Sequence, residues 1–246
     1  MTTSIRQGAN KMRIVTWNCQ MGLDKKVDAL LSLNPDVAVI PECSEKSAIA
    51  LRQRGFNSLW FGSNPHKGLG IICRQDWALR APPQPEQKWI APVEVLAPEP
   101  FTLIAIWACR IGSKNVDNYV GQVYHALTSH PEWFNGSPVV LAGDLNSNTI
   151  WDSRHKVVNH STVVKMLADR GLVSGYHYHF GETHGEESRP TIYFRRHEDK
   201  PYHIDYVFIP REWAVRLRTV EVGKFEAWSK LSDHCPVVVE VVPSPI

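Results

Sequence analysis

The sequence predicts an α/β protein (α+β) in which two mixed β-sheets pack face to face and helices cover their outer faces, a four-layer sandwich. Two observations predict this fold. Apolar runs rich in β-branched residues alternate with helical patterns, and polar residues follow the early strands but precede the late ones. These polar residues can meet at one edge only if the late strands run antiparallel to the early ones, because an all-parallel sheet brings together only the C-terminal ends of its strands.

The first half of the chain alternates between strands and helices. A helix capped by Asp24 is stopped by Asn34-Pro35, and prolines between residues 82 and 100 mark surface connections and edge strands. In order, the predicted elements are strand 13–17, helix 24–34, strand 36–42, helix 44–54 and strands 68–73, 89–96 and 101–107.

The second half begins with apolar residues at positions 116, 119, 120, 123 and 127, the spacing of an amphipathic helix. Residues 149–156 are expected to form a loop, and residues 174–201 show little periodicity. The other predicted elements are strand 139–142, helix 161–170, which Gly171 stops, and strands 202–209 and 235–242.

Length and composition indicate one domain, residues 13–246, preceded by a flexible segment, residues 1–12. The 27 basic and 25 acidic side chains give a formal charge of +2, which excludes a global field that attracts nucleic acid or membranes. The five cysteines are widely spaced, which favours free thiols over disulfides or a zinc site. With no signal peptide or apolar span, we expect a cytoplasmic monomer without a membrane anchor.

The stretch from Gly143 to Asn148 carries several polar side chains and directly follows a buried strand. In an extended backbone Asp144 and Asn146 point the same way, so a proton acceptor lies beside a neutral hydrogen-bond donor. A β-turn is the alternative interpretation, because Gly, Asp, Asn and Ser are also common turn residues.

Five short motifs lie at predicted strand ends: Trp17-Asn18, Pro41-Glu42, Gly143-Asp144-Leu145-Asn146, Ile204-Asp205-Tyr206 and Ser232-Asp233-His234-Cys235-Pro236. Each is weak alone, but in this order they resemble the endonuclease/exonuclease/phosphatase superfamily, which includes DNase I and the exonuclease III-type apurinic-site endonucleases. The resemblance implies a phosphodiester hydrolase dependent on Mg²⁺ or Mn²⁺, and we expect a nuclease that cleaves DNA or RNA by in-line attack of water. A phosphomonoesterase, a lipid or small-molecule phosphodiesterase, and a non-catalytic binding domain remain alternatives.

The resemblance also implies roles for the metal ligands. Glu42 would be the principal ligand of Mg²⁺, and Asp233 a second ligand, direct or through water. Asn18 would donate to the phosphate or orient a water on the metal. The alternatives are a charge at the start of a helix for Glu42 and a turn residue for Asn18.

The remaining motif residues would act on water and phosphate. Asp144 would orient or deprotonate the attacking water, and Asn146 would bond a non-bridging oxygen. His234 would contact the scissile phosphate, while Asp205 would hold its imidazole in one tautomer. A histidine before a strand is otherwise usually structural.

The chain departs from the family pattern at two positions. Trp107 stands where many members have His or Tyr, so Arg110 or one of the histidines 177, 179 and 203 would take that role. Gln20 stands where apurinic-site endonucleases usually carry an acidic residue.

Substrate contacts are expected from two segments, 148–156 and 176–203. Trp151 could stack on a base, and His203 and the basic residues Arg110, Arg154, Lys156, Arg195 and Arg196 could contact substrate. The alternative for each is an ordinary solvated loop. The pair His177 and His179 has strand spacing for metal binding, but without a third ligand a zinc site is not expected.

Overall fold

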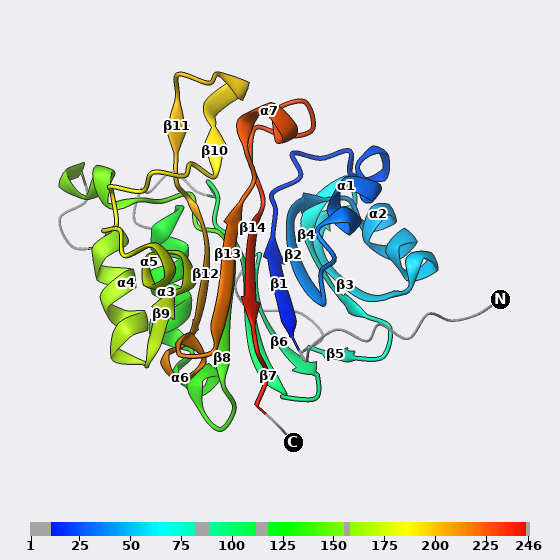
Figure 1. Cartoon of the computed structure of the whole chain (residues 1–246), viewed down its shortest axis with the longest axis horizontal. Coiled ribbons are helices and arrows are strands. Elements are labelled where there is room, and N and C mark those ends of the chain that lie inside the picture. Colours follow the sequence, from blue (N-terminus) through cyan, green and yellow to red (C-terminus); the bar gives the residue numbers. More distant parts are fainter. Residues whose placement is uncertain (1–10, 82–88, 112–117, 155–157, 245–246) are drawn as a thin grey trace.

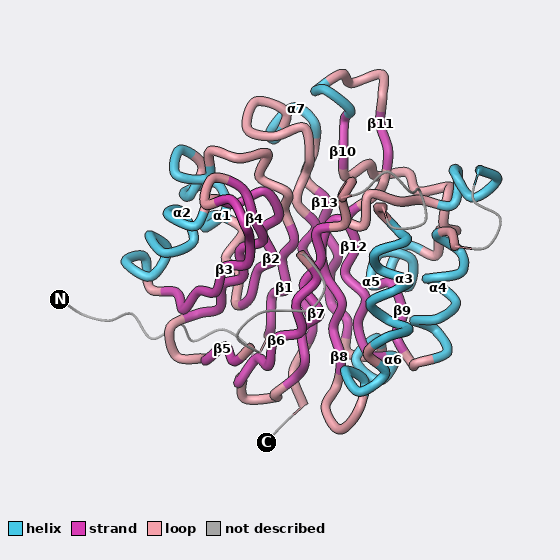
Figure 2. The backbone as a smooth tube through the Cα atoms, turned by 180° about the vertical axis from the view of Figure 1, so that it is seen from behind, coloured by secondary structure: helices cyan, strands magenta, loops and turns pink. Residues whose placement is uncertain are grey.

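Two mixed β-sheets form the centre of the molecule in the computed structural model, which describes residues 11–81, 89–111, 118–154 and 158–244 (Figure 1). The first six-stranded sheet has the order β13-β14-β1-β2-β4-β3, and the second has the order β5-β6-β7-β8-β12-β9. Helices cover the outer face of each sheet, as Figures 1 and 2 show from opposite sides. The predicted four-layer fold is therefore confirmed.

The first sheet comprises β1 (Met12–Thr16), β2 (Val37–Cys43), β3 (Phe56–Asn64), β4 (Lys67–Arg74), β13 (Leu217–Val222) and β14 (Val237–Val241). The second comprises β5 (Ala78–Arg80), β6 (Ile90–Leu96), β7 (Phe101–Trp107), β8 (Val139–Asp144), β9 (Leu172–Ser174) and β12 (Asp205–Pro210). A separate pair, β10 (Ile192–Tyr193) and β11 (Pro201–Tyr202), projects from one end of the sandwich (Figure 1).

The α-helices are α1 (Val27–Ser32), α2 (Glu45–Ala50), α3 (Val120–Ser129), α4 (His160–Asp169), α5 (Gly175–Phe180), α6 (Arg211–Ala214) and α7 (Phe225–Trp228). Short 3₁₀ helices are η1 (Leu23–Lys25), η2 (Leu51–Arg54), η4 (Pro131–Phe134), η5 (Thr149–Arg154) and η6 (Phe194–Arg196). Side-chain caps fix several of these starts: Ser44 accepts from the backbone N–H of Ser47, and Asn159 accepts from that of Thr162.

Strand directions agree with the prediction that late strands oppose early ones. Strand β14 pairs antiparallel with β1, and β12 pairs antiparallel with β8, whereas β1–β2 and β7–β8 are parallel. The register places Trp107 and Asp205 on either side of Asp144. The C-terminal ends of β7 and β8 and the start of β12 thus meet at one edge.

The core has one layer between the sheets and one under each set of helices. Strand β8 shows the alternation: Val140 and Ala142 face the other sheet, while Leu141 faces α3 and α4. Strand β1 does the same on the other sheet, since Ile14 points inward and Val15 packs under α1 and α2. Burying each such aliphatic side chain contributes about 1.5–3 kcal/mol, so the strand ends that carry polar groups are held by a rigid frame.

Several predicted elements need correction. Strands β3, β5, β9 and β13 were not predicted; β13 is an edge strand that exposes Arg218 and Glu221, so its pattern lacks a buried run. Asp24 caps no helix, because it lies inside η1, which Gly22 precedes, and Lys26 precedes α1. The predicted strand 202–209 is divided, since β11 ends at Tyr202 and β12 begins at Asp205.

Other differences concern loops and ends. The loop predicted after residue 148 contains η5, and the segment without periodicity contains α5. Helix α3 begins at Val120, while positions 116 and 117 of the predicted helix lie outside the described residues, as do residues 1–10 of the predicted flexible segment. The five cysteines are free, as expected. Among the described residues, no helix has the length and apolar character needed to cross a membrane.

Candidate active site

Asp144 ends strand β8 at the edge where the two sheets carry their polar residues, and its side chain is fully buried. The preceding Gly143 has φ 144°, and a Cβ atom there would collide with the backbone carbonyl of Ile106 on β7. Glycine therefore lets β8 pass close to β7 just before the carboxylate. The backbone N–H of Ala108 donates to the backbone carbonyl of Asp144 at 2.8 Å.

Two carboxamides hold the Asp144 carboxylate. Asn18 Nδ2 donates to Asp144 Oδ2 at 2.9 Å, as does Asn146 Nδ2 at 2.9 Å, and the backbone N–H of Asn146 donates to Oδ1 at 2.8 Å. Asn146 has φ 47°, so it lies in a left-handed turn and not in extended backbone. The predicted contact between Asp144 and Asn146 exists, but a turn produces it.

His234 and Asp205 form a second buried pair beside Asp144. His234 Nδ1 lies 2.8 Å from Asp205 Oδ2, and His234 Nε2 lies 4.0 Å from Asp144 Oδ2. The β8–β12 register places Asp205 directly opposite Asp144, which explains why two carboxylates and one imidazole share this edge. The pairing predicted for Asp205 and His234 is therefore present.

Burial and charge set the protonation of this group. Burial, together with the charge of Asp205, raises the pKa of Asp144 to about 7, although His234 and Asn18 act in the opposite direction. Burial alone would lower the pKa of His234, but the charge and hydrogen bond of Asp205, with the charge of Asp144, raise it to about 10. His234 is therefore a cation at neutral pH.

The first and last motifs are tied together through the backbone. Trp17 Nε1 donates to the carbonyl of His234 at 3.0 Å, and Ser232 Oγ donates to the carbonyl of Asn18 at 2.8 Å. The N–H of His234 donates in turn to Ser232 Oγ at 3.0 Å. These bonds explain why Asn18 on one strand end and His234 before another reach the same carboxylate.

Glu42 lies at a β-bulge of β2 with φ 61°, and its side chain is partly buried. Its Oε2 lies 3.1 Å from Lys67 Nζ, and this ammonium group also lies 5.0 Å from the ring centroid of Trp107. Trp107 itself is buried between the sheets and packs on Trp89. The Lys67 ammonium group thus lies over Trp107, the residue at the position where the resemblance implied His or Tyr.

Sequence reasoning missed Lys67. Lys67 begins β4, and β4 pairs antiparallel with β2 so that Gly68 faces Cys43, the residue after Glu42. The strand pairing that brings the two charges together depends on the β3–β4 hairpin, and β3 was not predicted.

The oxygen-rich donors of this edge fit a hard divalent cation. The carboxylates of Glu42 and Asp233 are partly exposed at this edge, and donor atoms of Asp144, Asp205 and the charged His234 lie within 4.8 Å of one another. Asp205 Oδ1 is buried and, among the described residues, has no hydrogen-bond partner. An unpaired buried carboxylate oxygen is costly, so a cation or water would stabilise it. Asp233, beside His234, is partly exposed.

The predicted substrate residues lie in different places. Trp151 and Arg154, from η5, line a pocket of about 300 Å³ together with Asn146 and Ser147. Arg195 is exposed near the tip of the β10–β11 hairpin, and Arg110 is exposed after β7. Lys156 lies outside the described residues.

Arg196, the other predicted phosphate contact, is exposed and holds Gln20, since Arg196 Nη2 lies 2.6 Å from Gln20 Oε1. At the position where an acidic residue was expected, the glutamine thus joins the first motif to the β10–β11 hairpin.

Of the three histidines considered for the position of Trp107, two lie on helix α5 and the third, His203, lies between β11 and β12. His177 and His179 belong to helix α5, so the expected strand spacing is wrong; Ser174 caps this helix by accepting from the His177 N–H. His177 contacts Glu187, His179 is exposed, and His203 is buried with Nδ1 2.8 Å from the carbonyl of Arg189.

Comparison with known proteins gives a consistent result. Residues 15–234 match the sequence model of the Endonuclease/Exonuclease/phosphatase family, which confirms the resemblance predicted from the five motifs. The family name covers enzymes that hydrolyse phosphate esters, so the predicted class of activity is confirmed at that level. No curated protein matches the sequence significantly.

Three solved structures illustrate the shared fold. The 3′–5′ exonuclease NExo from Neisseria meningitidis is 24% identical, with a TM-score of 0.67 over 94% of this chain and 99% of that one. The 3′ phosphatase NExo from Neisseria bound to a product DNA hairpin is 23% identical, with a TM-score of 0.68 over 94% and 99%. The apurinic-site endonuclease LMAP from Leishmania major is 13% identical, with a TM-score of 0.70 over 99% and 93%.

Proposed function

The chain belongs to the endonuclease/exonuclease/phosphatase family, and from this premise we propose that it is a divalent-metal-dependent nuclease that cleaves DNA by in-line attack of water. One observation carries the proposal: a buried histidine–aspartate pair lies beside a second carboxylate that two carboxamides hold in place. This arrangement combines a proton acceptor for water with a cation for the phosphate, which are the two groups that hydrolysis of a phosphodiester needs.

Asp144 is the residue that takes the proton of the attacking water. Its pKa of about 7 lies near neutral pH, where a general base is most effective. Both N–H groups of the Asn146 carboxamide are engaged, with Asp144 and with the carbonyl of Ala108 at 2.8 Å. Asn146 therefore positions Asp144, and its predicted contact with a non-bridging oxygen would require one of these bonds to break.

His234 supplies positive charge where the phosphate oxygens gain negative charge in the transition state. Asp205 fixes the ring by accepting from Nδ1, which leaves Nε2–H free to face the substrate and Asp144. Lys67 supplies a second cation next to Trp107, and we assign to it the charge role that Arg110 was expected to fill.

Mg²⁺ or Mn²⁺ would be held by Glu42 and Asp233, with Asn18 beside them, as hard oxygen donors suit either ion. When bound, the ion would add positive charge against the phosphate and lower the cost of the buried carboxylates. In the structure Lys67 is the cation that neutralises Glu42.

The neighbouring pocket supports a nucleic-acid substrate, and the likeness to NExo favours DNA. Trp151 and Arg154 line the 300 Å³ pocket that Asn146 closes on one side, so a base could stack on the indole while the guanidinium holds a flanking phosphate. The likeness to NExo, described as a 3′–5′ exonuclease and as a 3′ phosphatase with product DNA, supports a 3′ end as the site of attack. The free thiols support action in a reducing compartment such as the cytoplasm.

A panel of labelled substrates tests the proposal. Duplexes with a recessed 3′ hydroxyl, a 3′ phosphate or an internal abasic site, and the matching RNA, would be incubated with the purified chain and Mg²⁺ or Mn²⁺. We expect loss of 3′ nucleotides or 3′ phosphate that EDTA and Asp144→Asn abolish. The exposed Asp169→Asn, on α4, is the matched control and should leave the activity unchanged. No cleavage of any nucleic acid, with release of phosphate from a small ester instead, would overturn the nuclease assignment.

A further inference from the structure

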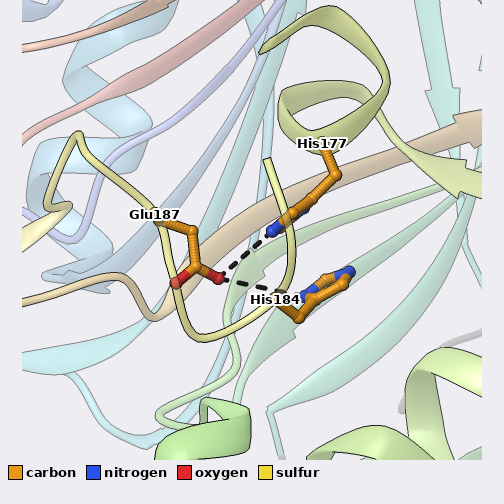
Figure 3. A group of neighbouring side chains, drawn as sticks. All are labelled: His177, His184 and Glu187. Atoms are coloured by element: carbon orange, nitrogen blue, oxygen red, sulfur yellow. Dashed lines mark hydrogen bonds and ion pairs between the residues drawn. The ribbon is translucent and has the colours of Figure 1, made fainter. Parts of the chain in front are cut away.

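A second group of metal-binding side chains lies away from the proposed active site, on the helix-covered face of the second sheet. Figure 3 shows His177 from helix α5 and His184 and Glu187 from the following loop pointing toward one another. Each offers one donor atom, and the three atoms lie within 4.8 Å of one another. None of these residues has a part in the proposed hydrolysis.

The spacing of the donor atoms suits a small metal ion. His177 Nε2 lies 3.2 Å and His184 Nδ1 lies 4.0 Å from Glu187 Oε1. A tetrahedral zinc ion with bonds of about 2.0–2.1 Å separates its ligand atoms by about 3.3–3.4 Å, so small side-chain movements would complete the geometry.

A fourth donor stands next to the group. His160 Nε2, at the start of α4, lies 3.2 Å from His184 Nδ1. One proton now joins these two rings, and a metal ion in its place would be faced by both nitrogens. Three histidines and one glutamate would surround the ion once the His160 ring moves closer, because His160 is not among the donors that lie within 4.8 Å of one another.

Outer hydrogen bonds orient the donors, as in established metal sites. Ser174 Oγ lies 2.7 Å from His177 Nδ1, and Ser147 Oγ lies 3.2 Å from His160 Nδ1, so each ring directs its Nε2 into the group. Asn148 Nδ2 donates to both oxygens of Glu187 at 3.1 Å.

Glu187 is held as a buried carboxylate by hydrogen bonds from Asn148 and from the backbone N–H of Gly185, and a cation in the group would balance its charge. Its side chain is only 3% exposed, and among the described residues the only possible cations within 4.0 Å are His177 and His184. The neighbouring His203 is also buried, and its Nε2 has no hydrogen-bond partner in the described part of the chain. A carboxylate buried without lysine or arginine is unfavourable unless a proton or a metal ion balances it.

We propose that His177, His184 and Glu187, with His160 as the fourth donor, form a structural zinc site. Residues 181–191 carry no regular secondary structure, so a metal ion would fasten this segment to α5 and α4 where no apolar core does so. Through Asn148 and Ser147 the site would also support the turn that follows Asn146. The inference does not depend on the proposed nuclease activity.

Zinc binding by the EDTA-treated full chain tests this site. We expect about one equivalent of Zn²⁺ by calorimetry in excess Mg²⁺, with a higher melting temperature, and tetrahedral Co²⁺ absorption when cobalt replaces zinc. Loss of an outer-shell partner alone weakens metal binding by about 10–100-fold, so His184→Gln and Glu187→Gln should weaken it at least as much. Asp144→Asn should bind Zn²⁺ as wild type does.

The exposed His179→Gln, on the same helix as His177, is the matched control and should also keep the binding. Circular dichroism of each metal-free variant separates loss of the site from loss of the fold. Wild-type affinity in folded His184→Gln and Glu187→Gln, or binding lost only with Asp144→Asn, would overturn the proposal.

Discussion

Replacing Asp205 by asparagine should change the charge of His234 near neutral pH. The carboxylate accepts from His234 Nδ1 at 2.8 Å inside the protein, and it is the main group that raises the pKa of the imidazole to about 10. Opposite charges about 4 Å apart at an effective dielectric constant of about 20 attract by about 4 kcal/mol. At about 1.4 kcal/mol per pKa unit, the loss of one such charge lowers the pKa by about three units, to about 7.

The consequence for activity follows from the lost cation. With a pKa of about 7, only about one tenth of the variant would carry a charged His234 at about pH 8, so the rate there should fall about 10-fold from charge alone. Loss of the fixed ring orientation would add to this. The activity of Asp205→Asn should therefore fall as the pH rises through about 7, whereas wild type should keep a charged His234 until about pH 10.

Two measurements check this reasoning. Titration of the histidine Cε1–H resonances by NMR gives the pKa of His234 directly in metal-free wild type and variant, and initial rates against pH give the effect on hydrolysis. His234→Gln identifies the resonance, and Asp169→Asn serves as the folded control. A His234 pKa that stays near 10 in Asp205→Asn, or a pH profile identical to that of wild type, would refute the assignment.

Three further predictions concern the frame, the second cation and the buried histidines. Gly143→Ala should destabilise the fold by about 4 kcal/mol or more, because the alanine Cβ would collide with the backbone of β7. Gly171→Ala, where the Cβ would enter open space, should cost about 1 kcal/mol, and denaturant unfolding compares the two variants. Lys67→Met should lower kcat/KM about 10–100-fold through loss of a charged phosphate contact, while the exposed Lys165→Met should not. Burial lowers the pKa of His160 to about 4, so this histidine makes the metal-free folded protein lose stability as the pH falls from about 6.5 toward 4, by about 1.4 kcal/mol per pH unit. His160→Asn should lower the acid slope by this amount, while His184, whose pKa burial lowers to about 3, keeps its own contribution.

Each of these has a contradicting outcome. Equal stability of the two alanine variants would show that β7 and β8 tolerate a side chain at Gly143. Unchanged kinetics in Lys67→Met would remove this lysine from the site. An unaltered acid slope in His160→Asn, measured by thermal unfolding across the same pH range, would mean that His160 is protonated in the folded state.

The sequence predicted the inner strands and most of the catalytic group for the same reason. Strands β8 and β14 lie within each sheet and are buried on both faces, so their apolar runs are unbroken and their ends are visible as a change to polar residues. Asp144 lies at the end of β8, and His234 lies just before β14. Their meeting then follows from strand direction alone, which is why the pairing could be expected without coordinates.

What was missed depends on contacts that no local pattern shows. The edge strands β3 and β13 are only partly buried, and their mixed composition is close to that of a loop. Lys67 reaches Glu42 only through the pairing of β4 with β2. Glu187 and His184 lie on an irregular segment, so the third ligand that the histidine pair needed could not be found from spacing, and the helical conformation of α5 directs His177, not His179, to it.

Asp144, held by Asn18 and Asn146 beside His234, should activate water for attack on phosphorus. Single-turnover cleavage of a 3′-labelled DNA duplex with Mg²⁺ or Mn²⁺, comparing wild type with Asp144→Asn, measures this step without product release. Loss of general-base assistance should slow the variant by about 10²–10⁴-fold while DNA binding and melting temperature stay close to wild type. A folded Asp144→Asn that cleaves DNA as fast as wild type would contradict the account.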